Sequence, residues 1–282
     1  AASAQKPRQV IDAMVSCMET GYANVHRGLH YMANAATEGF EGARETTRQF
    51  LNAASTDEII FTRNATEAYN LVASSMGLLG QIGEGDEIIL SIMEHHSNIV
   101  PWHFLRERRG AVIKWAPVDD EGNFLVEEYE KLFSARTRMV AITHMSNVLG
   151  TVTPAEEIVR IAHAHGVPVL LDGAQSAVHR PVDVKALDCD FFVFTGHKVY
   201  GPTGIGVLYG KRALLDAMPP VLTGGFPISA GGLPVCSGGL PLLPGGPPDG
   251  GSDGPRASST STSSPTTTVQ WAGGRTGSPT VG

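Results

Sequence analysis

The sequence predicts an α/β fold built on a mostly parallel β-sheet. Short apolar runs with the length and residue types of buried strands alternate with helical segments from residue 57 to residue 210. Strands that alternate with helices of this length imply right-handed crossovers and a parallel sheet. Polar side chains follow several of these runs directly, which is where α/β proteins bind ligands.

The chain before this alternation is helical. Residues 5–20 and 35–53 have helical spacing, and one stripe of the first segment carries Ile11, Met14, Val15 and Met18. An irregular link joins the two segments. We therefore expect an N-terminal helical segment within residues 1–55.

Seven strands and the helices between them are predicted in order. The strands are expected at residues 58–62, 87–92, 111–118, 139–145, 167–171, 191–194 and 204–210. Helices are expected at about 65–80, 97–109, 126–134 and 154–165. The last helix has clear ends, because Thr153 can cap its start, Pro154 suits the first helical position and Gly166 can close it.

The composition changes near Gly224. Residues 226–282 contain 13 Gly, 9 Pro, 9 Ser and 7 Thr but only 4 charged residues, which is too little apolar surface to offset the backbone entropy lost on folding. We expect one large domain over residues 1–224 and a low-complexity, disordered tail over 225–282. A shifted reading frame of GC-rich DNA yields such a composition, so we hypothesise that the tail arose in this way.

Composition and charge exclude several classes of protein. The formal net charge of −7 argues against a nucleic-acid surface, and no apolar run approaches the roughly 18 residues of a membrane span. Cys17, Cys189 and Cys236 are far apart, which suits a reducing compartment and predicts no metal site. The start has no initiator Met and no signal-peptide layout. We expect a cytoplasmic chain, trimmed at its front, with no nucleic-acid or membrane partner.

An acid and an amine follow two of the predicted strands. Asp172 comes after the strand at 167–171 and Lys198 after the strand at 191–194, so they meet at one sheet edge if the strands share a sheet. This pair suits pyridoxal phosphate (PLP), which takes a lysine as a Schiff base and an aspartate at its pyridine nitrogen. A structural ion pair is the alternative.

Further polar side chains at this edge favour the cofactor. Those just beyond predicted strands are Thr66, His95, Asn147, Asp172, Gln175, Thr195, His197 and Lys198. The helix that starts near Thr66 offers free N–H groups to a phosphate, although Asn64 or Thr66 can equally be an ordinary N-cap. His95 and His96 could bind a metal, but adjacent side chains on a strand point to opposite faces, so no metal is predicted.

The sequence closely resembles the class V aminotransferase superfamily and, within it, the SUF-type cysteine desulfurases. The matching stretches cover roughly residues 1–224 and include ANVHRGLH, FTRNATEAYNLVA, MEHHSNIVPW, THMSNVLGTV, VLLDGAQSAVHRPVDVKALDCDFFVFTGHKVYGPTGIGVLYG and MPP. The resemblance implies a fold type I PLP enzyme, with a mainly parallel seven-stranded sheet between helices, and a homodimer.

The resemblance also implies a role for each site residue. Lys198 would hold PLP as a Schiff base and move the substrate proton, Asp172 would keep the pyridine nitrogen protonated, and His95 would stack on the ring. Gln175 would bond the ring's phenolate oxygen, with Asn147 nearby, and the phosphate would contact Ala65, Thr66, Thr195 and His197. No catalytic role is assigned to Asn24, His26 or Arg27, which lie in the family's entrance segment.

The family converts L-cysteine to L-alanine and passes the sulfur, as a persulfide, to an acceptor protein for iron–sulfur cluster assembly. The family's sulfur-accepting cysteine and its carboxylate-binding arginine belong to a small C-terminal domain that has no match in this sequence. We therefore expect little or no turnover. The alternatives are a selenocysteine lyase acting on L-selenocysteine, another class V lyase, or a PLP-binding fragment without catalysis.

Overall fold

A computed structural model describes residues 2–26, 30–219 and 221 of this chain. The chain divides into a compact unit over Ala1–Gly239 and a second unit over Leu240–Gly282, and all described residues belong to the first. Arg27, Cys236 and the expected tail over 225–282 lie outside the described residues. The low-complexity tail therefore stays a prediction.

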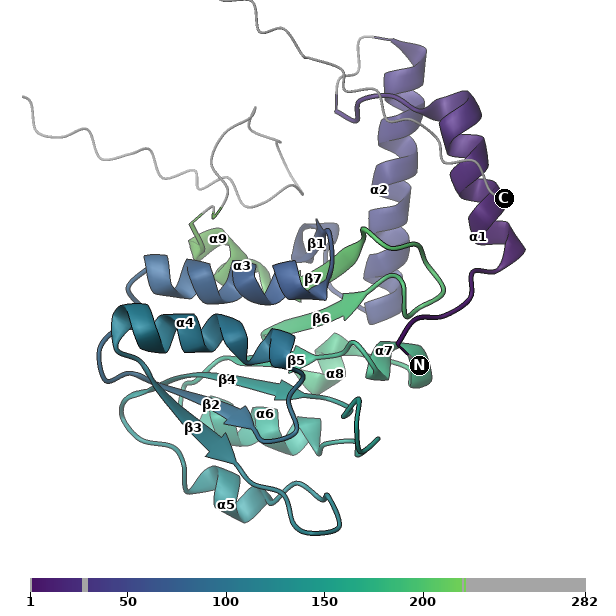
Figure 1. Ribbon diagram of the computed structural model, residues 1–282. Coiled ribbons are helices and arrows are strands. Elements are labelled where there is room, and N and C mark those ends of the chain that lie inside the picture. The colour runs from purple at the N-terminus through teal and green to yellow at the C-terminus, as the bar shows by residue number, and fades with distance from the viewer. Residues whose placement is uncertain (1, 27–29, 220, 222–282) are drawn as a thin grey trace, which may run out of the picture. The chain divides into compact units, whose positions relative to one another are not determined.

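The centre of the fold is one sheet of seven strands (Figure 1). The strands are β1 (Ile59–Thr62), β2 (Glu87–Ser91), β3 (Val112–Ala116), β4 (Thr137–Thr143), β5 (Val169–Asp172), β6 (Phe191–Thr195) and β7 (Gly206–Gly210). Their spatial order is β1-β7-β6-β5-β4-β2-β3, and β7 runs in the opposite direction to the other six strands. The predicted seven-stranded, mainly parallel sheet is confirmed.

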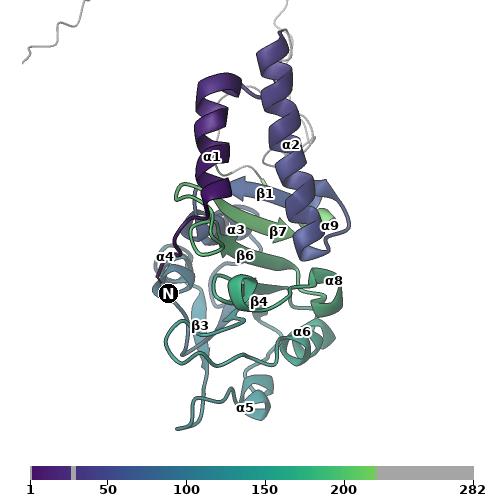
Figure 2. The same ribbon diagram turned by 90° about the vertical axis from the view of Figure 1, so that its right-hand side faces the viewer.

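Helices cover both faces of the sheet (Figures 1 and 2). The α-helices are α1 (Arg8–Ser16), α2 (Tyr31–Leu51), α3 (Ala65–Leu78), α4 (Val100–Arg109), α5 (Val126–Glu130), α6 (Ala155–Ala164), α7 (Ser176–His179), α8 (Val184–Leu187) and α9 (Arg212–Ala217). A π-helical turn, Cys17–Gly21, extends α1, and 3-10 turns lie at Thr56–Glu58 and His96–Asn98. None of the helices in the described part of the chain has the length and apolar character that a membrane crossing requires.

Side chains alternate along each strand, and this alternation divides the core into two layers. In β5, Leu170 belongs to the buried cluster that includes residues of α3, α4 and α9, whereas Leu171 belongs to the cluster that includes residues of α5 and α6. Fully buried aromatic side chains anchor each layer, with Trp102 and Tyr69 on the first face and Tyr129 on the second. The result is the expected α/β/α arrangement.

One local prediction differs from the structure. Thr153 does not cap α6, because its hydroxyl donates to the Thr143 carbonyl at 2.8 Å and Pro154 stands at the N-cap without a side-chain bond. The apolar stripe that the spacing placed on the first helix is exposed: no residue of α1 is buried, and Ile11 is 39 % exposed. Gly166 does close α6 as expected, with a φ of +69°.

Candidate active site

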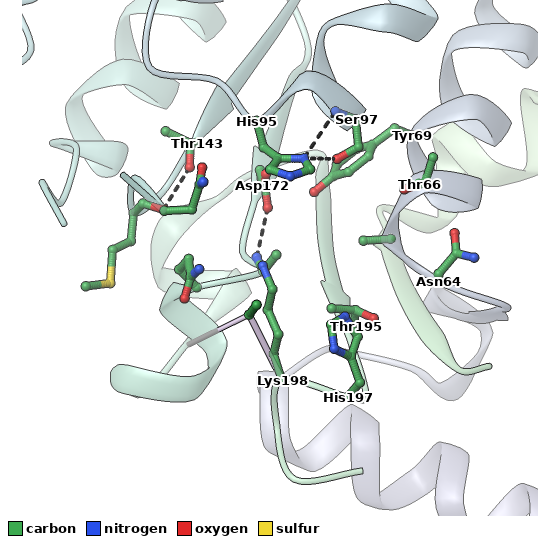
Figure 3. A pocket seen from close by; sticks show the side chains of 16 residues that line it. Asn64, Thr66, Tyr69, His95, Ser97, Thr143, Asp172, Thr195, His197 and Lys198 are labelled. Atoms are coloured by element: carbon green, nitrogen blue, oxygen red, sulfur yellow. Dashed lines mark hydrogen bonds between the residues drawn. The ribbon is translucent and has the colours of Figure 1, made fainter. Parts of the chain in front are cut away.

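A cavity of about 500 Å³ opens at the carboxyl ends of β4, β5 and β6 (Figure 3). The cavity is lined by all nine residues that the sequence analysis selected, namely Ala65, Thr66, His95, Asn147, Asp172, Gln175, Thr195, His197 and Lys198. Ala2, Asn64, Tyr69, Ser97, Thr143, Met145 and Ala174 complete the lining. The sheet therefore brings together side chains that are more than 130 residues apart in the sequence.

Asp172 is the last residue of β5 and is 4 % exposed. It pairs in register with Thr143 of β4 and Val193 of β6, which places it between two strand ends. Its Oδ1 accepts a hydrogen bond of 2.8 Å from the Ala174 N–H, so the turn after β5 orients the carboxylate. Gly173 allows that turn, since a Cβ there would lie 1.9 Å from the Phe192 ring.

Lys198 follows β6 in a tight turn, in which its N–H donates to the Thr195 carbonyl at 3.3 Å. Its half-buried side chain extends across the cavity toward Asp172 (Figure 3). The N-terminal segment contacts the neighbouring residue, His197, whose carbonyl accepts a hydrogen bond from the Ala4 N–H at 3.0 Å. Burial, and then the nearby Lys198 and Lys6 charges, lower the pKa of His197. These effects favour the neutral form of the His197 ring.

His95 follows β2, and its Nδ1 accepts the Ser97 N–H at 3.2 Å and lies 2.6 Å from the Ser97 hydroxyl. The proton of the neutral ring therefore belongs on Nε2. Burial first and His96 second lower the pKa of His95, although the Asp172 carboxylate opposes them. The idea that His95 and His96 point to opposite faces is wrong. They lie in a turn rather than a strand, and their rings stack with centroids 4.2 Å apart.

The first turn of α3 forms the opposite end of the cavity. Asn64 is the N-cap, as one of the two open interpretations held, and its side chain accepts from the Glu67 N–H at 2.8 Å. Within the described residues the N–H groups of Ala65 and Thr66 have no hydrogen-bond partner. Unpaired donors at a helix start are suited to a phosphate. The Asn64 cap therefore leaves the N–H groups of Ala65 and Thr66 available to an anion.

Two buried polar groups beside the site were not found from the sequence. Tyr69 lines the cavity from α3, and the buried Glu94 bonds to Thr143, another lining residue. The Glu94 carboxylate accepts from the Ser91 hydroxyl at 2.6 Å, the Thr143 N–H at 2.7 Å and the Asn98 amide at 2.8 Å. Burial nevertheless raises the pKa of Glu94 to about 8. The only available signal was a charged residue directly after an apolar strand.

The described residues contain no cluster of three or more His, Cys, Asp or Glu side chains arranged to hold a metal ion. Their two cysteines also lie away from the cavity. Cys17 is exposed after α1, and Cys189 is buried before β6. Burial raises the pKa of the Cys189 thiol, so this side chain stays protonated and unreactive in the folded protein.

Comparison with known proteins identifies a matching family and several similar proteins. The profile of the family described as aminotransferase class-V matches residues 1–233. A cysteine desulfurase of Synechococcus elongatus is 55 % identical over 225 residues, which are 80 % of this chain and 36 % of that protein.

Two solved structures are also similar. The cysteine desulfurase CsdA of Escherichia coli has a TM-score of 0.73 and 43 % identity over 79 % of this chain and 56 % of its own. A cysteine desulfurase from Thermococcus onnurineus, solved in its apo form, has a TM-score of 0.75 and 40 % identity. The match covers 79 % of this chain and 55 % of that protein's chain. This chain thus spans between about a third and just over half of the length of these relatives.

Proposed function

Because this chain belongs to the aminotransferase class-V family, we propose that residues 1–224 form the PLP-binding large domain of a cysteine desulfurase. The proposed reaction converts L-cysteine to L-alanine and transfers the sulfur to a thiol. The observation that carries the proposal is the shared cavity of Asp172, Lys198 and the α3 start. The names and identities of the relatives support the choice of cysteine as substrate.

The cavity fits PLP at each end. A buried carboxylate, Asp172, offers a partner to a protonated ring nitrogen, and the unpaired N–H groups of Ala65 and Thr66 offer partners to a phosphate. The neutral His95 ring presents a flat face that can cover an aromatic ring. When bound, PLP supplies an electron sink that stabilises negative charge at the substrate's α-carbon.

The residues of this chain then bind, orient and move protons. Lys198 would hold the cofactor through its amine and carry the substrate proton, and His95, whose Nδ1 accepts from the Ser97 N–H, would have a second exchangeable proton on Nε2. All four of the following residues line the cavity: Thr195 and His197 would add polar contacts to the phosphate, while Gln175 and Asn147 would hydrogen-bond the ring oxygen and the substrate. Asp172 provides the fixed negative charge that a protonated ring nitrogen requires.

Sulfur transfer needs a thiol that the described residues do not place at the cavity. Neither Cys17 nor Cys189 lines the cavity, and burial keeps the Cys189 thiol protonated by raising its pKa. We therefore propose that this chain binds and activates cysteine with little or no repeated turnover. By its resemblance to SUF-type enzymes, we also propose a cytoplasmic homodimer that supplies sulfur to an acceptor protein for iron–sulfur cluster assembly.

Titration of the purified chain with PLP tests this function. The visible absorption of lysine-bound PLP is expected in the wild type and in Lys131→Ala, which removes an exposed lysine that pairs with Glu128 away from the cavity. It is expected to vanish in Lys198→Ala. Equal spectra in the two variants would refute the cofactor site. Rapid, sustained release of alanine from cysteine would refute the expected lack of turnover.

A further inference from the structure

Tyr69 has a buried hydroxyl group that makes no hydrogen bond within the described residues. The residue lies in α3, its side chain is fully buried, and it forms part of the cavity wall. Figure 3 shows its ring extending from α3 toward Asp172. Folded proteins pair nearly all such groups, because an unpaired buried hydroxyl is costly, so this one requires an explanation.

The Asp172 carboxylate is an acceptor that suits the hydroxyl, and the Tyr69 ring extends toward it (Figure 3). Burial first, then the Asp172 charge and the approach of the phenol to that carboxylate, raise the pKa of Tyr69 well above its usual range, so the phenol keeps a proton to donate. Within the described residues Asp172 accepts one side-chain hydrogen bond, from Ala174 through Oδ1. A carboxylate has room for several donors, so Asp172 has capacity for a second.

The other charged or titratable groups around Asp172 do not occupy the place of a second hydrogen-bond donor, which is therefore open to Tyr69. Glu94 is bonded to Ser91, Asn98 and Thr143. His95 is bonded to Ser97 through Nδ1. Lys198 approaches from the opposite side of the cavity (Figure 3). Tyr69 is thus the buried neutral donor on the α3 side of the carboxylate.

Building on the proposed cofactor site, we propose that Tyr69 is a positioning residue whose hydroxyl donates a hydrogen bond to Asp172 and holds that carboxylate facing the cavity. An oriented carboxylate loses less freedom when a protonated ring nitrogen binds, so the bond favours cofactor binding. The role is separate from that of Asp172, since Tyr69 acts only through it.

Urea unfolding of the ligand-free chain tests the bond in a double-mutant cycle. Tyr69→Phe is expected to raise the unfolding equilibrium constant about tenfold, as for loss of a hydrogen bond to a charged group, and to have less than a twofold effect in an Asp172→Ala background. Tyr129→Phe is the matched control. It removes another buried phenol, which donates to the Ile158 carbonyl at 3.1 Å, so its effect should be equal in both backgrounds.

Removing a truly unpaired hydroxyl would instead leave stability unchanged or improved, and that result would overturn the proposal. Equal effects of Tyr69→Phe in the two backgrounds would also overturn it. If Tyr69→Phe does not fold, an NMR measurement of the phenol proton in the wild type tests the bond instead. A phenol proton held by a carboxylate should exchange slowly with solvent and give a resonance that Asp172→Ala removes, and its absence would count against the bond.

PLP binding provides the functional measurement. The dissociation constant should rise about tenfold in Tyr69→Phe and stay unchanged in Tyr129→Phe, whereas a merely structural role would affect both or neither. The two proposals fail separately. A wild type that binds no PLP refutes the cofactor site, while the unfolding cycle still decides whether Tyr69 holds Asp172.

Discussion

Gly206→Ala should displace the phosphate end of the candidate site without touching any proposed catalytic residue. Gly206 is the first residue of β7 and pairs with Thr62 and Thr195 on its two sides. Its backbone lies against Asn64, the N-cap of α3. Any side chain at this position therefore presses on the turn that presents the N–H groups of Ala65 and Thr66.

The size of the displacement follows from the distances. A Cβ at residue 206 would lie 2.5 Å from the Asn64 carbonyl carbon and 2.7 Å from its Cα, whereas ordinary contacts begin near 3.4 Å. The Asn64 backbone must therefore retreat by about 0.9 Å. Overpacking of this kind costs about 1–3 kcal/mol, and a hydrogen bond of normal length is lost when one partner moves that far.

Urea unfolding and PLP titration measure both effects. We expect Gly206→Ala to lower the free energy of unfolding by about 2 kcal/mol and to weaken PLP binding about tenfold. Gly39→Ala is the matched control, because a Cβ there has nothing within 4 Å and residue 39 lies inside α2. It should stabilise the chain by about 0.5–1 kcal/mol and leave PLP binding unchanged. Wild-type stability and affinity in Gly206→Ala would refute the reasoning.

Buried titratable groups give three more expected outcomes. Burial raises the pKa of Glu94 from 4.5 to about 8, so the folded state holds this proton more tightly, and the free energy of unfolding should fall as pH rises from 4.5 to about 8. Glu94→Gln should remove that slope in urea titrations, and a slope that persists would contradict this. Burial lowers the pKa of His144 from 6.5 to about 4, so the free energy of unfolding should fall as pH drops from 6.5 to about 4. His144→Phe should reduce this dependence on pH, and an unchanged dependence in that variant would count against the prediction. A thiol reagent followed by peptide mass spectrometry should label Cys17 in the native chain but Cys189 only after unfolding, and equal rates for both would show that Cys189 is not protected.

The sheet and the gathering of site residues were predictable because both depend on local sequence patterns. Apolar runs bounded by helical segments predict parallel strands, and parallel strands place the residues that follow them at one edge. Asp172 and Lys198 could be assigned to one cavity for this reason. The resemblance to a known family then supplied their roles, which spacing alone does not give.

Other features depend on contacts between distant segments, and sequence patterns do not report these. Thr153 is a residue type that commonly caps helices, but its hydroxyl donates a hydrogen bond to the carbonyl of Thr143 in β4 instead. Tyr69 reads as one apolar residue of a buried helix, and only the packing of α3 on the sheet brings its hydroxyl toward Asp172. Glu94 is similar, since its partner Thr143 is 49 residues away.

The most direct test of the account is to locate the lysine that binds PLP. Borohydride reduction makes a bond between a lysine amine and PLP permanent, and peptide mass spectrometry then identifies the modified residue. The account predicts modification of Lys198 alone in the wild type and none at that position in Lys198→Ala. Modification spread over surface lysines, with Lys198 unmodified, would contradict it.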